Sequence, residues 1–253
     1  MNNYRMTQKI GALVFFLGIS CTTFAQTENV KKVSRRPDIP GTFALEFGFN
    51  FDSGAPEQFS LGFWGSRTFN LYYQYELRIL KSNFSFVPGI GLSLERFKFN
   101  NDYTLDHDPA DPRSIVMIPP GESIYPNTKK SQLITNYIDV PLELRFSTNP
   151  DDPARSFKIS FGGRIGYMYD SFTKIKYKED TQVKKIKDKQ EYNLSPLRYG
   201  LSTRLGIGAF SLFGYYNLTP LFEEGEGISD ISASGAVKND FSTLTIGISL
   251  ASF

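Results

Sequence analysis

The chain alternates apolar and polar residues in repeated short runs, a pattern that predicts β-strands with one apolar and one polar face. In residues 137–146, for example, Ile138 and Val140 alternate with Asp139 and Glu143. Eight runs follow this pattern, and repeated runs of about ten residues with one apolar and one polar face are typical of a membrane-spanning β-barrel. The eight predicted strands are 42–51, 67–79, 84–99, 137–146, 157–169, 197–207, 210–218 and 243–250.

Two of these strands are less regular than the others. Pro88 interrupts 84–99, and Phe213 and Tyr215 lie on the face of 210–218 that should be polar. The total of eight is nevertheless an even number, as bacterial outer-membrane barrels require.

The connections between the predicted strands alternate in length. The odd connections are long, at 52–66, 100–130, 170–192 and 219–241. The even connections are shorter, at 80–83, 147–156 and 207–209. Long external loops and short periplasmic turns are typical of an outer-membrane barrel whose N-terminus lies in the periplasm.

The first 25 residues resemble a secretory signal peptide. Arg5 and Lys9 precede an apolar run at 10–20, and small residues stand before Gln26, which predicts cleavage between Ala25 and Gln26. Cys21 leaves open a lipoprotein alternative, in which this cysteine is the first mature residue. Cleavage after Ala25 would leave a mature chain without cysteine, and no later run of 18 apolar residues predicts a membrane helix.

These features predict an all-β fold, an eight-stranded antiparallel up-and-down transmembrane β-barrel that follows an N-terminal signal peptide. The predicted parts are the signal peptide at 1–25, a periplasmic lead-in at 26–40 and the outer-membrane barrel at 41–253. The alternative is a soluble β-sandwich or a lipocalin-like barrel, because soluble strands alternate in the same way. The membrane reading is favoured by the signal peptide, the missing cysteines, the glycine-rich polar faces and the aromatic residues near strand ends.

Composition excludes several classes of function. The 253 residues are 40% hydrophobic, 15% aromatic and 21% charged, which is unlike a disordered chain. The formal net charge of +2 gives no indication of a nucleic-acid partner. A single cysteine and a single histidine exclude a Cys/His zinc site and any catalysis that needs two histidines. No cofactor is expected.

The polar faces of the predicted strands carry five carboxylates and six cations that would point into the lumen. Because buried charges persist only when they are paired, we expect a salt-bridge network that closes the barrel. The alternative is a narrow channel for ions or small solutes. The predicted lumen residues are Glu46, Glu76, Arg78, Glu95, Asp139, Glu143, Arg145, Lys158, Arg164, Arg198 and Arg204.

The third and fourth external loops carry opposite charge. The segment 173–192 has seven lysines and four acids, whereas 219–240 has five acids and one lysine. These loops are neighbours on the rim, so their charges would hold them together or form a two-signed docking surface. The lysines could also meet lipopolysaccharide phosphates in the outer-membrane lipid. The docking candidates are Lys174, Lys176, Lys178, Lys184, Lys185, Lys187, Glu223, Glu224 and Glu226.

His107 lies in the second external loop between Asp106 and Asp108. A histidine oriented by a carboxylate could act as a general base, so a barrel hydrolase is a further alternative, although no serine motif accompanies it. The aspartates of this loop could hold calcium, but their spacing fits no known calcium loop.

Several short motifs resemble the PorT-like outer-membrane β-barrel family of Bacteroidota. The best match is Tyr137-Ile-Asp-Val-Pro-Leu-Glu-Leu-Arg-Phe146, and Gly162-Gly-Arg-Ile-Gly-Tyr167 is similar to the next strand of that family. Later matches are Lys174-Ile-Lys176, Leu197-Arg-Tyr-Gly200, Phe213-Gly-Tyr-Tyr216 and Leu221-Phe222. One feature departs from the pattern of such barrels: the apolar residues Ile246, Ile248 and Leu250 are one position out of register with Phe253.

The resemblance implies an integral protein of the bacterial outer membrane. Its founding member implies a part in type 9 protein secretion. Together with the residues, it leads us to expect a non-enzymatic surface or envelope protein, or a secretion accessory, with an envelope or secretion-system protein as partner. The narrow porin and the hydrolase using His107 remain the alternatives.

Overall fold

The computed structural model describes residues 41–108, 114–229, 237–238 and 241–252. Contacts between residues divide the chain into Met1–Ile39 and Pro40–Phe253, and the description below concerns the second unit. The predicted signal peptide, its cleavage site at Ala25 and Gln26, and the periplasmic lead-in lie outside the described residues.

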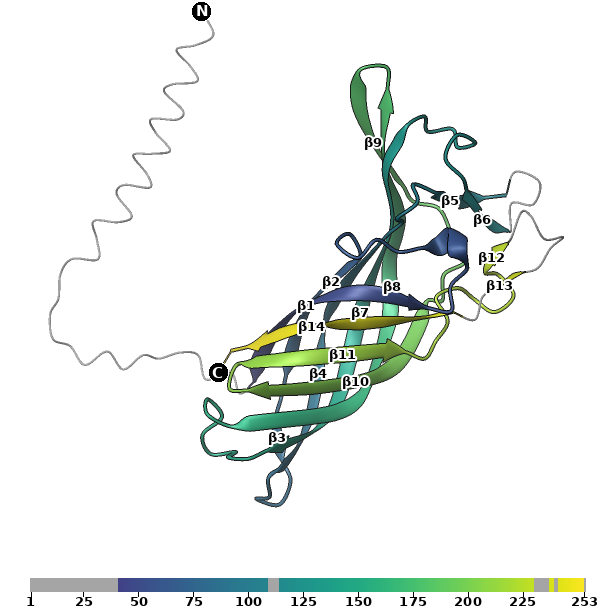
Figure 1. The fold of residues 1–253 in the computed structure, drawn as a ribbon. Helices are drawn as coiled ribbons and strands as arrows, with labels where there is room; N and C mark the ends of the chain where they lie inside the picture. Colours follow the sequence, from purple (N-terminus) through teal and green to yellow (C-terminus); the bar gives the residue numbers. More distant parts are fainter. Residues whose placement is uncertain (1–40, 109–113, 230–236, 239–240, 253) are drawn as a thin grey trace, which may run out of the picture. The chain divides into compact units, whose positions relative to one another are not determined.

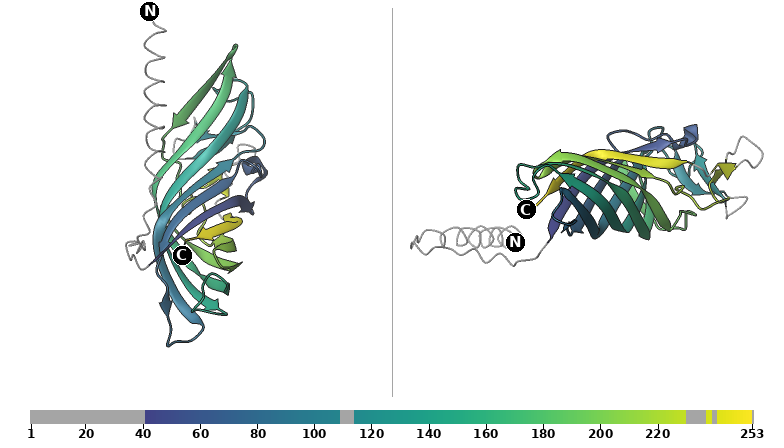
Figure 2. Two further views of the ribbon diagram at one scale, coloured as in Figure 1. Left: turned by 90° about the vertical axis from the view of Figure 1, so that its left-hand side faces the viewer. Right: turned by 90° about the horizontal axis from the view of Figure 1, so that it is seen from below.

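Eight antiparallel strands form a closed ring, which confirms the eight predicted strands. Each strand pairs with the next of the eight in the chain, and β14 pairs with β1 to close the ring. Figures 1 and 2 show these strands running obliquely around the ring. The eight are β1 (Thr42–Ser53), β2 (Arg67–Gln74), β4 (Phe84–Lys98), β7 (Thr128–Ser147), β8 (Phe157–Glu179), β10 (Leu197–Ile207), β11 (Phe210–Asn217) and β14 (Ser242–Ala251).

The predicted strand at 67–79 is divided in the structure into β2 and the short β3 (Leu77–Arg78). The division lies opposite Pro88 of β4, whose carbonyl accepts a hydrogen bond from the Tyr75 N–H at 2.9 Å. Because proline has no N–H, it cannot return the second bond of this pair. The hydrogen-bond ladder along β4 is therefore interrupted at Pro88, the residue that also interrupts the alternation of the predicted strand 84–99.

Strands β7 and β8 extend well beyond the predicted segments. Strand β8 continues to Glu179 and pairs with β9 (Gln182–Asp188), so the prediction of a loop at 170–192 was wrong over most of its length. The alternation continues there, with Thr173, Ile175 and Tyr177 on one face and lysines on the other. This β8–β9 hairpin extends beyond the other strands of the ring (Figure 1).

A second, smaller sheet forms within the predicted loops 100–130 and 219–241. Its strands are β5 (Thr104–His107), β6 (Ile115–Ile118), β12 (Ile228–Ser229) and β13 (Val237–Lys238), in the order β13-β12-β6-β5. The pairing of β6 with β12 joins the second and fourth long connections. A short 3-10 helix, η1 (Glu57–Phe59), lies in the first long connection.

The ring is apolar on its outside and polar within, the reverse of a soluble barrel. Exposed side chains from all eight strands form the outer surface, among them Phe47, Phe69, Leu92, Val140, Ile165, Leu201, Leu212 and Ile248. The alternate positions are buried and mostly polar. Within the described residues, no helix has the length and hydrophobicity needed to cross a membrane.

Candidate functional site

The interior of the ring holds eight of the eleven predicted lumen residues as buried side chains. The alternation of each strand turns them inward, and they meet ion-pair partners from other strands. The eight are Glu46, Glu95, Asp139, Glu143, Arg145, Arg164, Arg198 and Arg204.

Arg198 of β10 connects two carboxylates from different strands. Its Nη2 lies 2.9 Å from Asp139 Oδ2 of β7, and its Nη1 lies 2.7 Å from Glu95 Oε1 of β4. The guanidinium also lies over the Tyr137 ring, 3.7 Å from the centroid. Asp139 accepts a further hydrogen bond from the Tyr72 hydroxyl at 2.8 Å. Polar groups of four strands are therefore joined across the interior.

Arg204 and Arg164 extend this network toward β1. Arg204 Nη1 lies 2.5 Å from Glu46 Oε1, and its Nη2 lies 2.8 Å from Glu143 Oε1. Arg164 Nη2 lies 3.3 Å from Glu46 Oε2. The Arg164 guanidinium is also stacked on the Tyr215 ring, with 4.4 Å to the centroid. Each of these buried charges has an oppositely charged partner, which offsets part of the cost of taking it out of water.

Glycines provide the space that these large inward side chains need. A Cβ added at Gly166 would lie 2.2 Å from Asp139 Oδ1, and one at Gly247 would lie 2.8 Å from a ring carbon of Phe213. The inward Phe213 and Tyr215 of the irregular strand are accommodated by this means. At Gly166 and Gly247 a neighbouring side chain therefore occupies the space that a Cβ would take.

The remaining three predicted lumen residues lie at the end of the ring with the short turns, which faces the periplasm in proteins of this architecture. Glu76 is exposed and binds Arg145, with 2.9 Å between Oε2 and Nη1. Lys158 is half-buried and donates to the Gly208 carbonyl at 3.4 Å. The prediction of Arg78 as part of the lumen network was wrong: this side chain binds Asp151 of a turn at 2.8 Å, because β3 lies beyond the buried part of the ring.

The free space inside the ring is small. A cavity of about 260 Å³ opens at the short-turn end beside Glu76, Arg78 and Lys158. The next cavity inward, beside Arg145 and Arg204, measures about 20 Å³, roughly the space of one water molecule. The buried side chains of Arg164 and Arg198 and their carboxylate partners lie between these cavities and the external end.

The external end carries an apolar core, which we call the cap core. It consists of Phe59, Phe97, Phe99, Leu105, Ile115, Met117, Leu133, Tyr192, Leu194, Leu221, Phe222, Ile228 and Phe241. All four predicted external loops contribute to it, together with inward residues of β4 and β7. The loops therefore fold into a packed layer over the mouth of the ring.

The sequence patterns did not predict the cap core, because most of its residues are irregularly spaced within segments assigned to loops. One signal was available: Ile115–Ile118 is a continuous apolar run, which is unusual for a solvated loop. The aromatic contacts between Phe59, Phe99 and Phe222 join three different connections and have no local pattern.

The lysine-rich segment and the acidic loop meet through their backbones. The Glu223 N–H donates to the Asn193 carbonyl at 2.8 Å, and Leu194 forms a bridge with Phe222. The ion pairs of the lysines in this hairpin lie within the hairpin itself, between Lys184 and Glu179 and between Lys189 and Asp170. Within the described part of the chain, no lysine of 174–189 forms an ion pair with Glu224 or Glu226.

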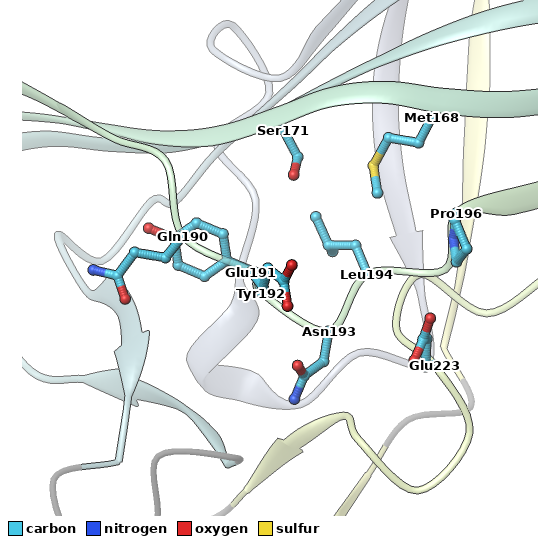
Figure 3. Close-up of a pocket in the computed structure, with 9 residues that line it drawn as sticks. All are labelled: Met168, Ser171, Gln190, Glu191, Tyr192, Asn193, Leu194, Pro196 and Glu223. Carbon is cyan, nitrogen blue, oxygen red and sulfur yellow. The ribbon is translucent and has the colours of Figure 1, made fainter.

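Two carboxylates flank a pocket of about 300 Å³ where these loops meet (Figure 3). Met168 and Ser171 of β8 form one wall, and Glu191 and Glu223 lie on the other sides. Tyr192 lines the pocket with its ring in the cap core, and this burial raises the pKa of its phenol. On the hairpin, a hydrogen bond from Lys189 lowers the pKa of the Asp170 carboxyl.

His107 lies at the edge of the cap core. Its ring is stacked on Tyr192 with 6.0 Å between centroids, and its buried Nδ1 has no hydrogen-bond partner among the described residues. Asp106 accepts a hydrogen bond from the His107 backbone N–H rather than from its ring. No group of three or more potential metal ligands occurs within the described residues, which exclude Asp111.

A family model described as "Outer membrane protein beta-barrel domain" matches residues 15–223. The chain therefore belongs to this family, and it is an integral protein of the outer membrane whose ring of strands is a transmembrane barrel. Its apolar outer surface is accordingly the surface that faces lipid.

Among solved structures, the chain is similar to Ail, the attachment invasion locus protein of Yersinia pestis. The sequence identity is 15% and the TM-score 0.35, over 85% of this chain and 100% of the Ail chain. A second structure shows Ail in complex with the heparin analogue sucrose octasulfate, at 14% identity and a TM-score of 0.32 over the same shares of both chains. No curated protein sequence matches the chain.

Proposed function

We propose that this protein is a non-enzymatic surface protein of the outer membrane that binds a protein partner through the β8–β9 hairpin and the adjoining cap. The observation that carries this proposal is the filled interior. Arginine–carboxylate pairs occupy the middle of the barrel, and the cap core covers its external mouth. Because side chains occupy both the lumen and its external mouth, the groups that a partner can reach lie on the external surface.

The hairpin supports a docking role because it extends outward and is strongly basic. Lys178, Lys184 and Lys185 are exposed near its tip, and Val183 adds an exposed apolar side chain. The acidic pocket beside Glu191 and Glu223 lies at the base of the same hairpin. A partner with an acidic segment would be attracted to the tip by charge complementarity.

A pull-down from detergent-solubilised outer membranes tests this proposal. The tagged wild-type protein is compared with a variant in which Lys178, Lys184 and Lys185 are changed to Gln. We expect a protein that the wild type retains in low salt and the variant loses. A matched control changes Arg78 and Arg155, at the opposite end of the barrel, to Gln and should retain the protein. Identical captured proteins for wild type and tip variant would contradict the proposal.

Planar bilayer recordings separate this function from transport. A filled lumen predicts no steady single-channel openings by the wild-type protein. Large, steady openings would favour the narrow porin instead.

We also propose that the partner belongs to a protein-secretion machinery, as the resemblance to the PorT-like family implies for type 9 secretion. Deletion of the gene should then reduce secreted protein in the culture medium, and the wild-type gene should restore it. Unchanged secretion after deletion would leave surface attachment or envelope structure as the role.

A further inference from the structure

One side of the barrel carries a group of cations on its lipid-facing surface, just external to the apolar band. We call Arg67, Arg96, Lys98, Lys130 and Lys174 the basic cluster. They lie on four adjacent strands, β2, β4, β7 and β8, and alternation turns their side chains outward. None of them forms an ion pair with a described carboxylate; Asp170, an acid on the same face, is bound by Lys189.

Strand pairing places several of these cations directly opposite one another. Arg67 is the partner of Arg96, and Lys174 is the partner of Lys187. Lys130, Lys176 and Lys185 form a row of three across β7, β8 and β9. Like charges directly opposite in a sheet are destabilising, so this arrangement favours an anion that lies between them.

Two neighbouring grooves on this surface combine the cations with an apolar floor. The first, of about 250 Å³, is lined by Phe47, Phe69 and Leu94 together with Arg67 and Arg96. The second, of about 230 Å³, shares Leu94 and Arg96 and adds Ile134, Phe172 and Lys174, with Gln132 and Asn136. An apolar floor with cations at its rim fits a lipid with an anionic head group.

The aromatic residues beside the cluster indicate its depth in the membrane. Phe49 is the strand partner of Arg67, and it is stacked on Phe63 with 4.6 Å between centroids. Trp64, which is 78% exposed, contacts both rings. Exposed aromatic clusters of this kind lie at the level of the lipid head groups. The cations next to them are therefore at the height of head-group phosphates in the outer leaflet.

We propose that the basic cluster binds the phosphate groups of lipopolysaccharide in the outer leaflet, while the two grooves hold the adjoining part of its acyl chains. Lipopolysaccharide is the occupant that fits, since its lipid A anchor presents two phosphates on one head group and the cluster presents paired cations. This inference depends on the outer-membrane location and does not depend on the proposed protein partner.

Native mass spectrometry of the detergent-purified full chain tests it. The probes are diphosphorylated lipid A, its dephosphorylated form and phosphatidylglycerol. A variant with Arg67, Arg96 and Lys174 changed to Gln should bind diphosphorylated lipid A at least tenfold more weakly than wild type. The control variant with Arg78, Lys81 and Arg155 changed to Gln loses the same charge at the short-turn end of the barrel and should change binding less than twofold.

The fluorescence of Trp64, the only tryptophan of the chain, provides a second readout next to the cluster. Diphosphorylated lipid A should shift its emission in the wild type and not in the cluster variant. The cluster variant should fold, because it loses like-charge repulsion, and unfolding in phosphatidylcholine vesicles checks this.

Three results would overturn the proposal. They are equal binding of phosphorylated and dephosphorylated lipid A, unchanged binding by a folded cluster variant, and binding of phosphatidylglycerol as tight as that of lipid A. The last would indicate a surface for any anionic head group. Any of these results would leave the proposed docking role unaffected, because the pull-down tests that role separately with the variant in which Lys178, Lys184 and Lys185 are changed to Gln.

Discussion

Arg198 of β10 and Asp139 of β7 lie side by side in the middle of the barrel, with 2.9 Å between Nη2 and Oδ2, although 59 residues separate them in the chain. Both side chains are almost completely buried. A charge taken out of water loses its hydration, so each of these groups depends on the other.

Removing one partner of this pair should destabilise the barrel strongly. We expect Asp139→Asn to lower the free energy of unfolding by roughly 3–5 kcal/mol, because it leaves a buried guanidinium poorly compensated. The double variant Asp139→Asn/Arg198→Gln should cost less than the sum of the two single changes. Urea unfolding in lipid vesicles, followed by Trp64 fluorescence, measures these values. Arg78→Gln is the control, since its exposed pair with Asp151 is worth about 0–1 kcal/mol.

Gly166 and Gly163 of β8 should respond differently to alanine. A Cβ at Gly166 would meet Asp139 Oδ1 at 2.2 Å, whereas one at Gly163 has its nearest atom, the Gly200 carbonyl oxygen, at 3.5 Å. Overpacking of a filled interior predicts a loss of about 1–3 kcal/mol for Gly166→Ala. The same unfolding measurement should show little change for Gly163→Ala, and equal effects would argue against a tightly filled lumen.

A charge on the outer surface should be tolerated only outside the lipid band. Ile165, which is exposed in the middle of β8, should lose about 2–4 kcal/mol when changed to Arg. Val183→Arg places the same side chain near the hairpin tip and should leave the free energy of unfolding within about 0.5 kcal/mol. A harmless Ile165→Arg would mean that this face is not in lipid.

The cap core should open when its central aromatic side chain is truncated. Phe222 is fully buried and contacts Phe59 and Phe241, so Phe222→Ala should destabilise the packed loops by roughly 3–5 kcal/mol. Limited proteolysis of the reconstituted protein should then cleave the external segments faster. The lipid-facing Phe210→Ala is the matched control, and an unchanged cleavage rate for Phe222→Ala would contradict the packed cap.

The cap should also weaken at high pH. Burial raises the pKa of Tyr192 above its value of about 10 in an unfolded chain, so the phenol ionises more readily when the cap opens. Its contribution to stability is complete below about pH 10 and is lost as the pH rises through the folded pKa. Protease cleavage should therefore be faster at pH 11 than at pH 10 or pH 8, and this increase should be smaller for Tyr192→Phe. The lipid-facing Tyr199→Phe should behave like wild type.

The local pattern was sufficient for the eight strands of the ring and for which side of each of them turns inward. Ile138 and Asp139 illustrate this: their alternation alone places one toward lipid and the other toward the lumen once the chain is recognised as a membrane protein. The extension of β8 beyond Tyr169 also alternates, at Lys174 and Ile175, but it does so one residue out of register, because the pairing with β7 shifts beside Asn136 and Tyr137.

The alternation did not predict which of the inward charges would pair with one another. Nothing near Glu46 in the sequence indicates that it will meet Arg164 and Arg204, since these contacts depend on how the strands tilt and on how far arginine reaches across the lumen. Arg78 is a different case. Its alternation predicts an inward side chain, but β3 lies beyond the buried part of the ring, so Arg78 binds Asp151 and is not part of the network.

The sequence by itself therefore determined the eight strands of the ring and their two faces, because a strand's alternation is a local property of the chain. Only the tertiary structure decided which charges pair, how the loops form the cap core and which cations share the outer surface. Those relationships join residues from distant strands and loops, and closure of the ring, with its tilt and strand pairing, is what brings them within contact distance.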